Sequence, residues 1–530
     1  MIEDFREYEP GALIEADVCV IGAGAAGITI AHEFVRNNKK VVILESGGFE
    51  YEPDVQALYK GSVVGRDYYD LDDSRLRYFG GTTGHWGGNC GPNPSIEFEK
   101  LDWIKYSGWP ITRAELDPFY ERAQVICGLG PYIYDERNWK VLDVDPPKFD
   151  PKKLRVLFTQ FSKPIRFGEH YRSEIDSSRS VRVLLHANVV NIQTNPTGSK
   201  VEYLDLSTLQ GKRGRAKARY YVLACGGIEN ARLLLASNTV ESHGVGNRND
   251  LVGRFFADHL GAQSATFHSD DAFRLLDIFL RQRARNHQQQ YRPRILLSDT
   301  LLRTNRIPSS WVIIDYEADP EAGTKSLEFV GKRLLRRGRW PPPKDLGVAV
   351  WRVFRDLDDV AYNFHRYFVR GKDPIAPPRI LTLETGISPV PNPESRVSLT
   401  KEKDALGMPR VQLDWRLSPQ DKIAARNVTQ AVASEIGRLG WGRVKLADWL
   451  MDDGLDFGDE SGHAWHHMGT TRMATDPKHG VVDGNCLVHG TDNFYIGGSS
   501  VFPTFGVYGP TFTIVALAVR LADHLKGRLG

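Results

Sequence analysis

Short, uninterrupted apolar runs near the N-terminus predict strands that are buried on both faces. Residues 17–21 (DVCVI) form the first run, and residues 41–44 (VVIL) form the second. A glycine-rich hexapeptide and a helix-like segment from residue 28 to about residue 36 lie between them. Apolar runs of this length are typical of strands in a parallel sheet that is covered on both sides. This order of elements predicts a strand–helix–strand unit.

The hexapeptide GAGAAG supplies the glycines that a dinucleotide-binding turn requires. Gly22 makes the tight turn, Gly24 lets the backbone approach a pyrophosphate, and Gly27 permits close helix–strand packing. Free N–H groups at the helix N-terminus favour phosphates. Glu45 ends the second apolar run, where a carboxylate can accept hydrogen bonds from ribose hydroxyls. A GxGxxG on its own is often only a turn, but its place between strand and helix predicts dinucleotide binding.

Residues 77–93 (RYFGGTTGHWGGNCGPN) are too rich in glycine for a regular element. They could form a surface loop. A backbone with so few side chains can instead lie flat against a large planar ligand and offer it N–H donors. An isoalloxazine ring needs such a flat binding surface, whereas a nicotinamide does not need one so long. The segment therefore favours a flavin dinucleotide.

Later segments complete a nucleotide-binding fold. Residues 180–190 and 218–226 are strand-like, and the second run turns through two glycines into a predicted helix at residues 228–237. Near the C-terminus, residues 493–500 (NFYIGGSS) lead to the apolar helix PTFTIVALAVRLADHL. Glycine turns before a helix can direct N–H groups and the positive end of the helix dipole at an electron-rich ring.

Composition narrows the class of protein. A chain of 530 residues exceeds the size of one hydrophobic core, so two or more domains are expected. The net charge of +2 gives no argument for nucleic acid or a membrane surface as partner, and no apolar stretch is long enough to span a bilayer. The five scattered cysteines indicate reduced thiols. The acidic N-terminus has no apolar signal region, so a cytoplasmic location is expected.

Five motifs in this order resemble the glucose–methanol–choline (GMC) oxidoreductase family. They are GAGAAG with Glu45, GGTTGHWGGN, ACGGIENARLLL, HHMGTTRM and the terminal GGSSVFPT…GPTFTIVALAVRLADHL. The match is most similar to the branch with pyranose oxidases, glycoside 3-oxidases and bacterial sugar dehydrogenases. The resemblance implies FAD as cofactor. The residues expected to contact it are Gly22, Gly24, Ala25, Gly27, Glu45, Ser46, Gly81, Thr82, His85, Trp86, Gly87, Gly88, Asn89, Val189, Ala224, Gly498, Ser499, Pro510 and Thr511.

The resemblance also implies an α/β fold, α+β overall. A Rossmann-like FAD-binding domain would be assembled from discontinuous segments, with a substrate domain made of a sheet and covering helices. We expect the FAD-binding domain at residues 1–100, 180–265 and 455–530, and the substrate domain at 101–179 and 266–454. Two basic stretches in the middle, residues 281–294 and 332–344, are interpreted as a solvated lid or surface insertion. They could also bind a partner, an anionic substrate or a membrane surface.

The stretch AWHHMGTTRM raises the question of what two adjacent histidines do. A metal site could use His463, His466 and His467, but no Cys, Asp or Glu lies among them, and adjacent side chains diverge. One of the pair could be a buried structural histidine. The third interpretation is acid/base catalysis, because a neutral histidine with a pKa near ~6.5 can take the hydroxyl proton of an alcohol while a hydride leaves.

By the resemblance, the catalytic histidine stands three residues before the glycine of the Gly-Thr motif. That glycine is Gly469, which assigns the role to His466 and leaves His467 as second choice. One departure concerns the position before the terminal Pro-Thr, where the family usually has a second His or Asn and this chain has Gly509. Tyr508, His467 or a water could replace that side chain. His85 aligns with the histidine that carries covalent flavin in some pyranose oxidases, although many relatives hold FAD without a covalent bond.

The expected function is FAD-dependent oxidation of a hydroxyl of a sugar or glycoside to a carbonyl, with a hydride passing to flavin N5. Oxidation of an aminoglycoside, another amino sugar or a non-sugar alcohol is the alternative within the same chemistry. A flavin-containing lyase without redox turnover is the alternative that Gly509 suggests. No sequence motif identifies the electron acceptor, which is oxygen or another compound.

Overall fold

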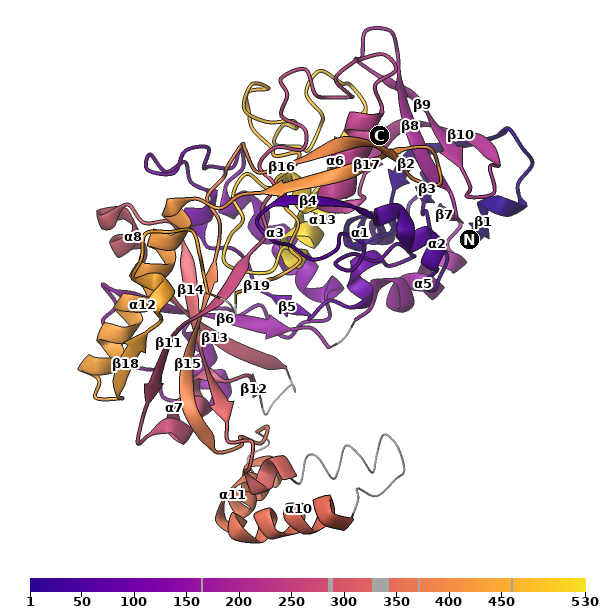
Figure 1. The fold of residues 1–530 in the computed structure, drawn as a ribbon. Helices are drawn as coiled ribbons and strands as arrows, with labels where there is room; N and C mark the ends of the chain where they lie inside the picture. The colour runs from indigo at the N-terminus through magenta and orange to yellow at the C-terminus, as the bar shows by residue number, and fades with distance from the viewer. Residues whose placement is uncertain (164, 285–288, 327–342, 370–371, 459–460) are drawn as a thin grey trace.

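The molecule contains two large β-sheets, as the computed structural model shows (Figure 1). The structure describes residues 1–163, 165–284, 289–326, 343–369, 372–458 and 461–530. One sheet is mainly parallel and the other is antiparallel. The fold is therefore a mixed α/β fold with a Rossmann-like sheet and a second, substrate-side sheet, as the sequence predicted.

The first sheet is built from the two ends of the chain and one central segment. Its parallel part runs β1, β7, β3, β2, β10 and β20, and β9 and β8 continue it antiparallel beyond β10. The strands are β1 (Ile2–Asp4), β2 (Ala12–Ile21), β3 (Val41–Leu44), β7 (Val181–Leu185), β8 (Asn188–Thr194), β9 (Val201–Ser207), β10 (Arg213–Leu223) and β20 (Phe494–Ile496).

The predicted strand–helix–strand unit is present, with longer boundaries. β2 begins five residues before the predicted run, and α1 (Ala25–Phe34) begins three residues before the predicted helix. The extended backbone of Gly24 at the helix N-cap places the start of α1 directly behind the turn, and the two alanines that follow are good helix formers. The N-terminus of α1 therefore lies at the carboxyl ends of the parallel strands, where α/β sheets bind ligands.

The second sheet is antiparallel, in the order β18, β11, β15, β14, β13, β6 and β5. Its strands, with the short β12 and β19 that pair with β13 and β11, are β5 (Asn89–Cys90), β6 (Leu154–Phe161), β11 (Leu260–His268), β12 (Gln282–Arg283), β13 (Gln290–Leu297), β14 (Ser310–Ala318), β15 (Pro378–Ile387), β18 (Arg443–Leu446) and β19 (Gly462–His463). The helix α12 (Pro419–Arg438) packs against this sheet, and Ser418 and Asp421 form the capping box that starts it.

A third, small sheet and the remaining helices complete the molecule. The small sheet contains β4 (Gly61–Gly65), β16 (Arg396–Lys403) and β17 (Pro409–Trp415). The terminal helix α13 packs against α1 and α3. The helices are α2 (Pro53–Gln56), α3 (Arg113–Ile126), α4 (Arg137–Leu142), α5 (Phe167–Ser177), α6 (Gly226–Ala236), α7 (Ala272–Phe279), α8 (Asp299–Asn305), α10 (Pro343–Arg355), α11 (Leu357–Phe368) and α13 (Thr511–Leu529).

The middle of the chain contains a projecting helical pair, α10 and α11, which stands away from both large sheets (Figure 1). Large apolar side chains such as Trp351, Phe354 and Phe368 are exposed on it. The basic stretch 332–344, interpreted above as a lid or insertion, lies outside the described residues except for its last two. Among the described residues, no helix is both long and apolar enough to cross a membrane. The five cysteines are all unpaired.

Candidate active site

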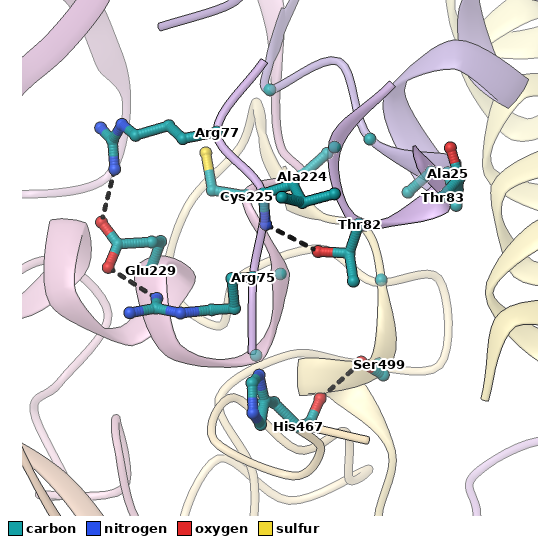
Figure 2. A pocket seen from close by; sticks show the side chains of 18 of the residues that line it. Ala25, Arg75, Arg77, Thr82, Thr83, Ala224, Cys225, Glu229, His467 and Ser499 are labelled. Atoms are coloured by element: carbon teal, nitrogen blue, oxygen red, sulfur yellow. Dashed lines mark hydrogen bonds and ion pairs between the residues drawn. The ribbon is translucent and has the colours of Figure 1, made fainter. Parts of the chain in front are cut away.

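One cavity of about 460 Å³ brings together all the predicted site residues except Gly27. Its wall combines the carboxyl ends of the parallel strands, the loop at residues 77–93 and the segment at residues 464–467 (Figure 2). The predicted residues on this wall are Gly22, Gly24, Ala25, Glu45, Ser46, Gly81, Thr82, His85, Trp86, Gly87, Gly88, Asn89, Val189, Ala224, His466, His467, Gly498, Ser499, Pro510 and Thr511. Segments more than 400 residues apart in the sequence thus meet at one site.

Gly27 shapes the turn from behind the cavity wall. A Cβ atom at this position would lie 2.0 Å from the carbonyl oxygen of Gly22 and 3.4 Å from Val20 Cγ1. Gly22 itself has a positive φ of 99°, and its Cβ would lie 2.8 Å from the carbonyl oxygen of Ala224. Only glycine fits at these two positions, because strand, helix and the end of β10 approach one another directly here.

Glu45 is held at the end of β3 by backbone donors. Its Oε2 accepts the N–H of Ala23 at 2.8 Å, and its Oε1 accepts the N–H of Gly47 at 3.0 Å. The carboxylate therefore ties the glycine turn to the strand that follows it. Each carboxylate oxygen can accept a further bond, so the group remains able to receive ribose hydroxyls from the cavity side.

Four glycines on the cavity wall face open space. Among the residues that the structure describes, a Cβ added to Gly24, Gly87, Gly226 or Gly498 would meet no atom within 4 Å. The backbone at these positions is bare towards the cavity, which suits a ligand that lies close against it. Two buried polar atoms on the same wall, His85 Nε2 and Asn89 Oδ1, have no hydrogen-bond partner in the part of the chain that the structure describes. Such atoms point to a polar ligand in the cavity, because an unpaired buried polar group is costly.

Asp258 fixes the backbone that carries the candidate base. Its Oδ1 accepts the N–H of His466 at 2.7 Å, and its Oδ2 accepts the N–H of Trp465 at 3.0 Å. Trp465 has a positive φ of 60°, a strained value that these bonds help to hold. Pairing of β19 with the start of β11 brings this segment beside Asp258. Sequence reasoning missed Asp258, because no motif marks it.

The imidazole of His466 lies between the cavity and a second histidine. Its Nδ1 is 3.0 Å from Nδ1 of His259, and its Nε2 and Cε1 face Gly509 on the cavity wall. Burial lowers the pKa of His466 well below its ordinary value of 6.5, and the neighbouring His259, Arg294 and His467 lower it further. His466 is therefore neutral near pH 7 and can act as a base.

His467 points away from His466 and joins a different hydrogen-bond chain. Its Nε2 lies 2.9 Å from the hydroxyl of Tyr68, which donates to Asp258 Oδ2 at 2.6 Å. His467 Nε2 is therefore the donor in its contact with Tyr68. Burial and the charge of Arg75 lower the pKa of His467 to about 3. The two adjacent histidines thus separate: one faces His259, the other is anchored to Tyr68.

His463, the third histidine of the metal alternative, packs against aromatic rings. Its ring centroid lies 4.7 Å from that of Tyr68 and 4.8 Å from that of Trp415. No group of three or more His, Cys, Asp or Glu side chains that could hold a metal ion occurs among the described residues. His463 and His467 both lie near the ring of Tyr68, whereas His466 contacts His259.

Tyr508 does not replace the side chain that Gly509 lacks, and this possibility from the sequence was wrong. Its hydroxyl donates to the carbonyl oxygen of Phe158 on β6 at 3.0 Å, and its ring fills the space beside Gly91. Tyr508 is fully buried and is not part of the cavity wall. Trp465 lines the cavity and lies near His85, with ring centroids 5.3 Å apart.

A buried group of charged residues forms another part of the wall, and sequence reasoning missed it. Glu229 lies 2.9 Å from Arg75 and 3.3 Å from Arg77 (Figure 2). Arg232 lies 3.3 Å from Glu229 and also pairs with Asp404 at 2.6 Å. Burial by itself raises the pKa of Glu229, but the three guanidinium groups outweigh it and lower that pKa to about 2. The RLR sequence before the glycine loop and the ENAR sequence of α6 were the available hints.

Comparisons with known proteins agree with this geometry. A family profile described as GMC oxidoreductase matches residues 391–518. The chain is 26% identical to the 6'''-hydroxyparomomycin C oxidase of Streptomyces lividus, over 98% of this chain and 93% of that protein. It is 29% identical to the pyranose 2-oxidase of Emericella nidulans, over 99% and 94%.

The fold is similar to that of a crystal structure of formate oxidase. The TM-score is 0.56 at 18% identity, with 98% of this chain and 99% of that chain covered. At this identity the likeness concerns the fold alone. It agrees with the mainly parallel sheet and the antiparallel sheet described above. Residues 391–518 match the GMC oxidoreductase family, and the chain is an oxidoreductase that acts on CH–OH groups, as an oxidase or a dehydrogenase.

Proposed function

We propose that the chain oxidises a hydroxyl of a neutral sugar or glycoside to a carbonyl, with FAD as cofactor and His466 as the base. The observation that carries this proposal is the position of His466 Nε2. It faces the cavity at Gly509, next to Asn89 of the glycine-rich loop. The neutral state of this imidazole near pH 7 supports its use as a proton acceptor.

The residues present fit FAD. The N-terminus of α1 behind Gly24 would hold the pyrophosphate, and Glu45 would receive the ribose hydroxyls. The loop with His85 and Asn89 would lie along the flavin. There, His85 Nε2 and Asn89 Oδ1 would be available for hydrogen bonds with the cofactor. GMC relatives bind FAD, which supports the same cofactor here. When bound, FAD supplies a two-electron acceptor for the hydride that leaves the alcohol carbon.

The protein's own part in the reaction is the removal of one proton. The alcohol loses a hydride from carbon and a proton from oxygen, and a carbonyl remains. His466 Nε2 takes the hydroxyl proton, so negative charge on the oxygen is relieved as the hydride leaves. Asp258 holds the base in place through the backbone N–H of His466. Substrate and cofactor fill the cavity when they bind, and this excludes water from the reacting atoms.

Charge on the cavity wall favours a neutral substrate over an amino sugar. A cationic substrate needs free carboxylates, yet Glu45 and Glu229 are the only acidic side chains on the described wall. Glu229 is already bound by three guanidinium groups, and Glu45 is held by backbone N–H groups. The arginines add positive charge to the same surface. The indole of Trp465, partly exposed at the cavity, offers an apolar platform for the C–H face of a sugar ring.

Anaerobic reduction of the bound flavin tests the proposal. Purified holoenzyme is mixed with neutral sugars, glycosides, aminoglycosides and simple alcohols, and loss of flavin absorbance is followed. We expect the fastest bleaching with a neutral sugar or glycoside. Faster bleaching by aminoglycosides would overturn the choice of substrate, and no bleaching by any alcohol would overturn the whole proposal. The lyase alternative rests on Gly509 alone. Because the imidazole of His466 adjoins this glycine, the site still contains a base, and nothing else favours a lyase.

A further inference from the structure

His259 lies directly behind the proposed base, in a position that no sequence motif marks. It precedes β11 and is 2% exposed. Its Nδ1 contacts His466 Nδ1 at 3.0 Å, and the two rings stand nearly perpendicular, with an interplanar angle of 89°. Its other ring nitrogen, Nε2, lies 3.0 Å from the carbonyl oxygen of Gly506 and 3.2 Å from that of Phe505. Both nitrogens of His259 therefore have defined partners.

These partners determine where the protons lie. Carbonyl oxygens only accept hydrogen bonds, so Nε2 of His259 carries a proton. Burial lowers the pKa of His259 to about 4, with a further contribution from Arg294, so the ring is neutral near pH 7. Its Nδ1 then has a lone pair and accepts. The short contact between the two Nδ1 atoms requires one proton, which must belong to His466. With its proton on Nδ1, neutral His466 has a bare Nε2 towards the cavity.

The charged surroundings keep both rings neutral. Arg294 is buried, donates to Thr159 Oγ1 and to the carbonyl oxygen of Val507, and has no ion pair with a carboxylate in the described part of the chain. Its positive charge disfavours a second cation and lowers the pKa of both histidines. Two other titratable groups lie near His466: His467, whose ring points towards Tyr68, lowers the pKa of His466, and Asp258 accepts the backbone N–H of His466.

We propose that His259 is a positioning residue that fixes the tautomer and orientation of His466, so that Nε2 is the proton acceptor. The proposal rests on the proposed role of His466 as base. His259 thus lies on the Nδ1 side of His466, away from the cavity. Gly509 occupies the position that faces Nε2 of His466. Without an acceptor behind it, His466 could move its proton to Nε2 and lose the lone pair that the reaction needs.

Two substitutions separate tautomer control from packing. His259→Phe keeps a ring beside Trp311 and removes the acceptor, and His259→Asp supplies an acceptor that cannot donate when ionised. We expect His259→Phe to lower the limiting rate of flavin reduction about tenfold to hundredfold, the usual cost of losing a group that orients a functional histidine. FAD content and substrate affinity should stay close to wild type. We expect His259→Asp to recover much of the rate.

The pH profile adds a readout that a packing role would not move. A carboxylate at residue 259 stabilises the imidazolium of His466, so in His259→Asp the acid limb of flavin reduction should move to higher pH. Flavin reduction at the wild-type rate in His259→Phe would overturn the proposal. So would an Asp variant that is no faster than Phe and has an unmoved acid limb. His259→Leu, a smaller acceptor-free side chain, replaces His259→Phe if that variant does not fold.

His466→Ala distinguishes failure of this proposal from failure of the proposed function. If His466→Ala reduces flavin at the wild-type rate, the assignment of the base is wrong and the role of His259 falls with it. If His466→Ala is slow while His259→Phe, with FAD bound, matches wild type, only the role of His259 is overturned. Thermal unfolding of each holoenzyme is measured in parallel as a control for folding.

Discussion

Gly509 and His466 face each other so closely that a Cβ atom on Gly509 would lie 3.4 Å from both Cε1 and Nε2 of the imidazole. The same Cβ would lie 3.5 Å from the carbonyl oxygen of Asn89. A methyl group at this position is in ordinary contact, whereas a larger side chain would occupy the space of the imidazole or of the substrate in front of it. The glycine is thus part of the geometry of the base.

We expect Gly509→Ala and Gly509→Val to differ sharply. The alanine variant should fold, bind FAD and reduce it within a few-fold of the wild-type rate, since the new methyl group forces no large shift. The valine variant should lose far more activity, because overpacking of a filled site displaces the groups around it at a cost of about 1–3 kcal/mol. Stopped-flow flavin reduction and FAD content measure both. Equal rates in the two variants would contradict the close packing of this pair.

Replacement of His466 by alanine should leave the cofactor bound and slow its reduction. The turn at Gly22 and the carboxylate of Glu45 lie in another part of the cavity, so flavin absorbance and thermal stability should change little. The limiting rate of reduction by substrate should fall by roughly 10²–10⁴, the usual contribution of a positioned base. His467→Ala is the matched control and should cost less, acting more through substrate affinity. The reverse order would show that the wrong histidine has been assigned.

The acid limb of flavin reduction should lie below the pH expected for an ordinary histidine. Only the neutral form of His466 accepts a proton, and its pKa is lowered by burial and by nearby His259, Arg294 and His467. A lowered pKa keeps the neutral form at more acidic pH, so the rate should stay nearly constant from pH 8 down past 6.5. Reduction rates at saturating substrate across this range provide the measurement. A half-maximal rate at pH 6.5 or above would contradict the burial of this base.

Two glycines of the same motif should respond differently to alanine. Gly22→Ala should destabilise the fold, because it adds a Cβ 2.8 Å from the carbonyl oxygen of Ala224 at a positive φ of 99°. Gly24→Ala should leave the apoprotein stable, because its Cβ would point into open cavity, but should weaken FAD binding. Thermal unfolding of apoprotein and FAD titration separate the two effects. Loss of stability in both variants would argue against the open space at Gly24.

Tyr68→Phe should destabilise the protein without removing the base. The substitution leaves the Nε2–H of His467 without its acceptor and takes one donor from Asp258. An unsatisfied buried donor costs about 1–3 kcal/mol, so the midpoint of urea unfolding should fall by a corresponding amount. Flavin reduction should decrease much less than in His466→Ala, since Asp258 still accepts the backbone N–H of His466. Unchanged stability would mean that the hydrogen bonds among His467, Tyr68 and Asp258 contribute little to the free energy of unfolding.

The sequence alone determined the features that depend on neighbouring residues. The run DVCVI, the glycines of GAGAAG and the run VVIL predicted a strand–turn–helix–strand unit, and β2, α1 and β3 are present there. The local pattern predicts these elements, because the hydrophobic period, the turn glycines and helix capping each depend on residues only a few positions apart. The glycine-rich loop and the paired histidines of HHMGTTRM were likewise expected at the site from the sequence itself, and residues of the loop and both histidines line the cavity.

Only the tertiary structure decided which partners these residues have. His259 contacts His466 across 207 residues, its sequence neighbour Asp258 accepts the backbone N–H of His466, and Tyr68 and Arg294 come from two further places in the chain. The same packing turned Tyr508 towards Phe158 and directed His467 towards Tyr68. A hydrogen-bond partner, the proton on an imidazole and a lowered pKa all depend on atoms within a few ångströms in space. Residues far apart in the sequence reach that distance only through pairing of strands such as β11 and β19.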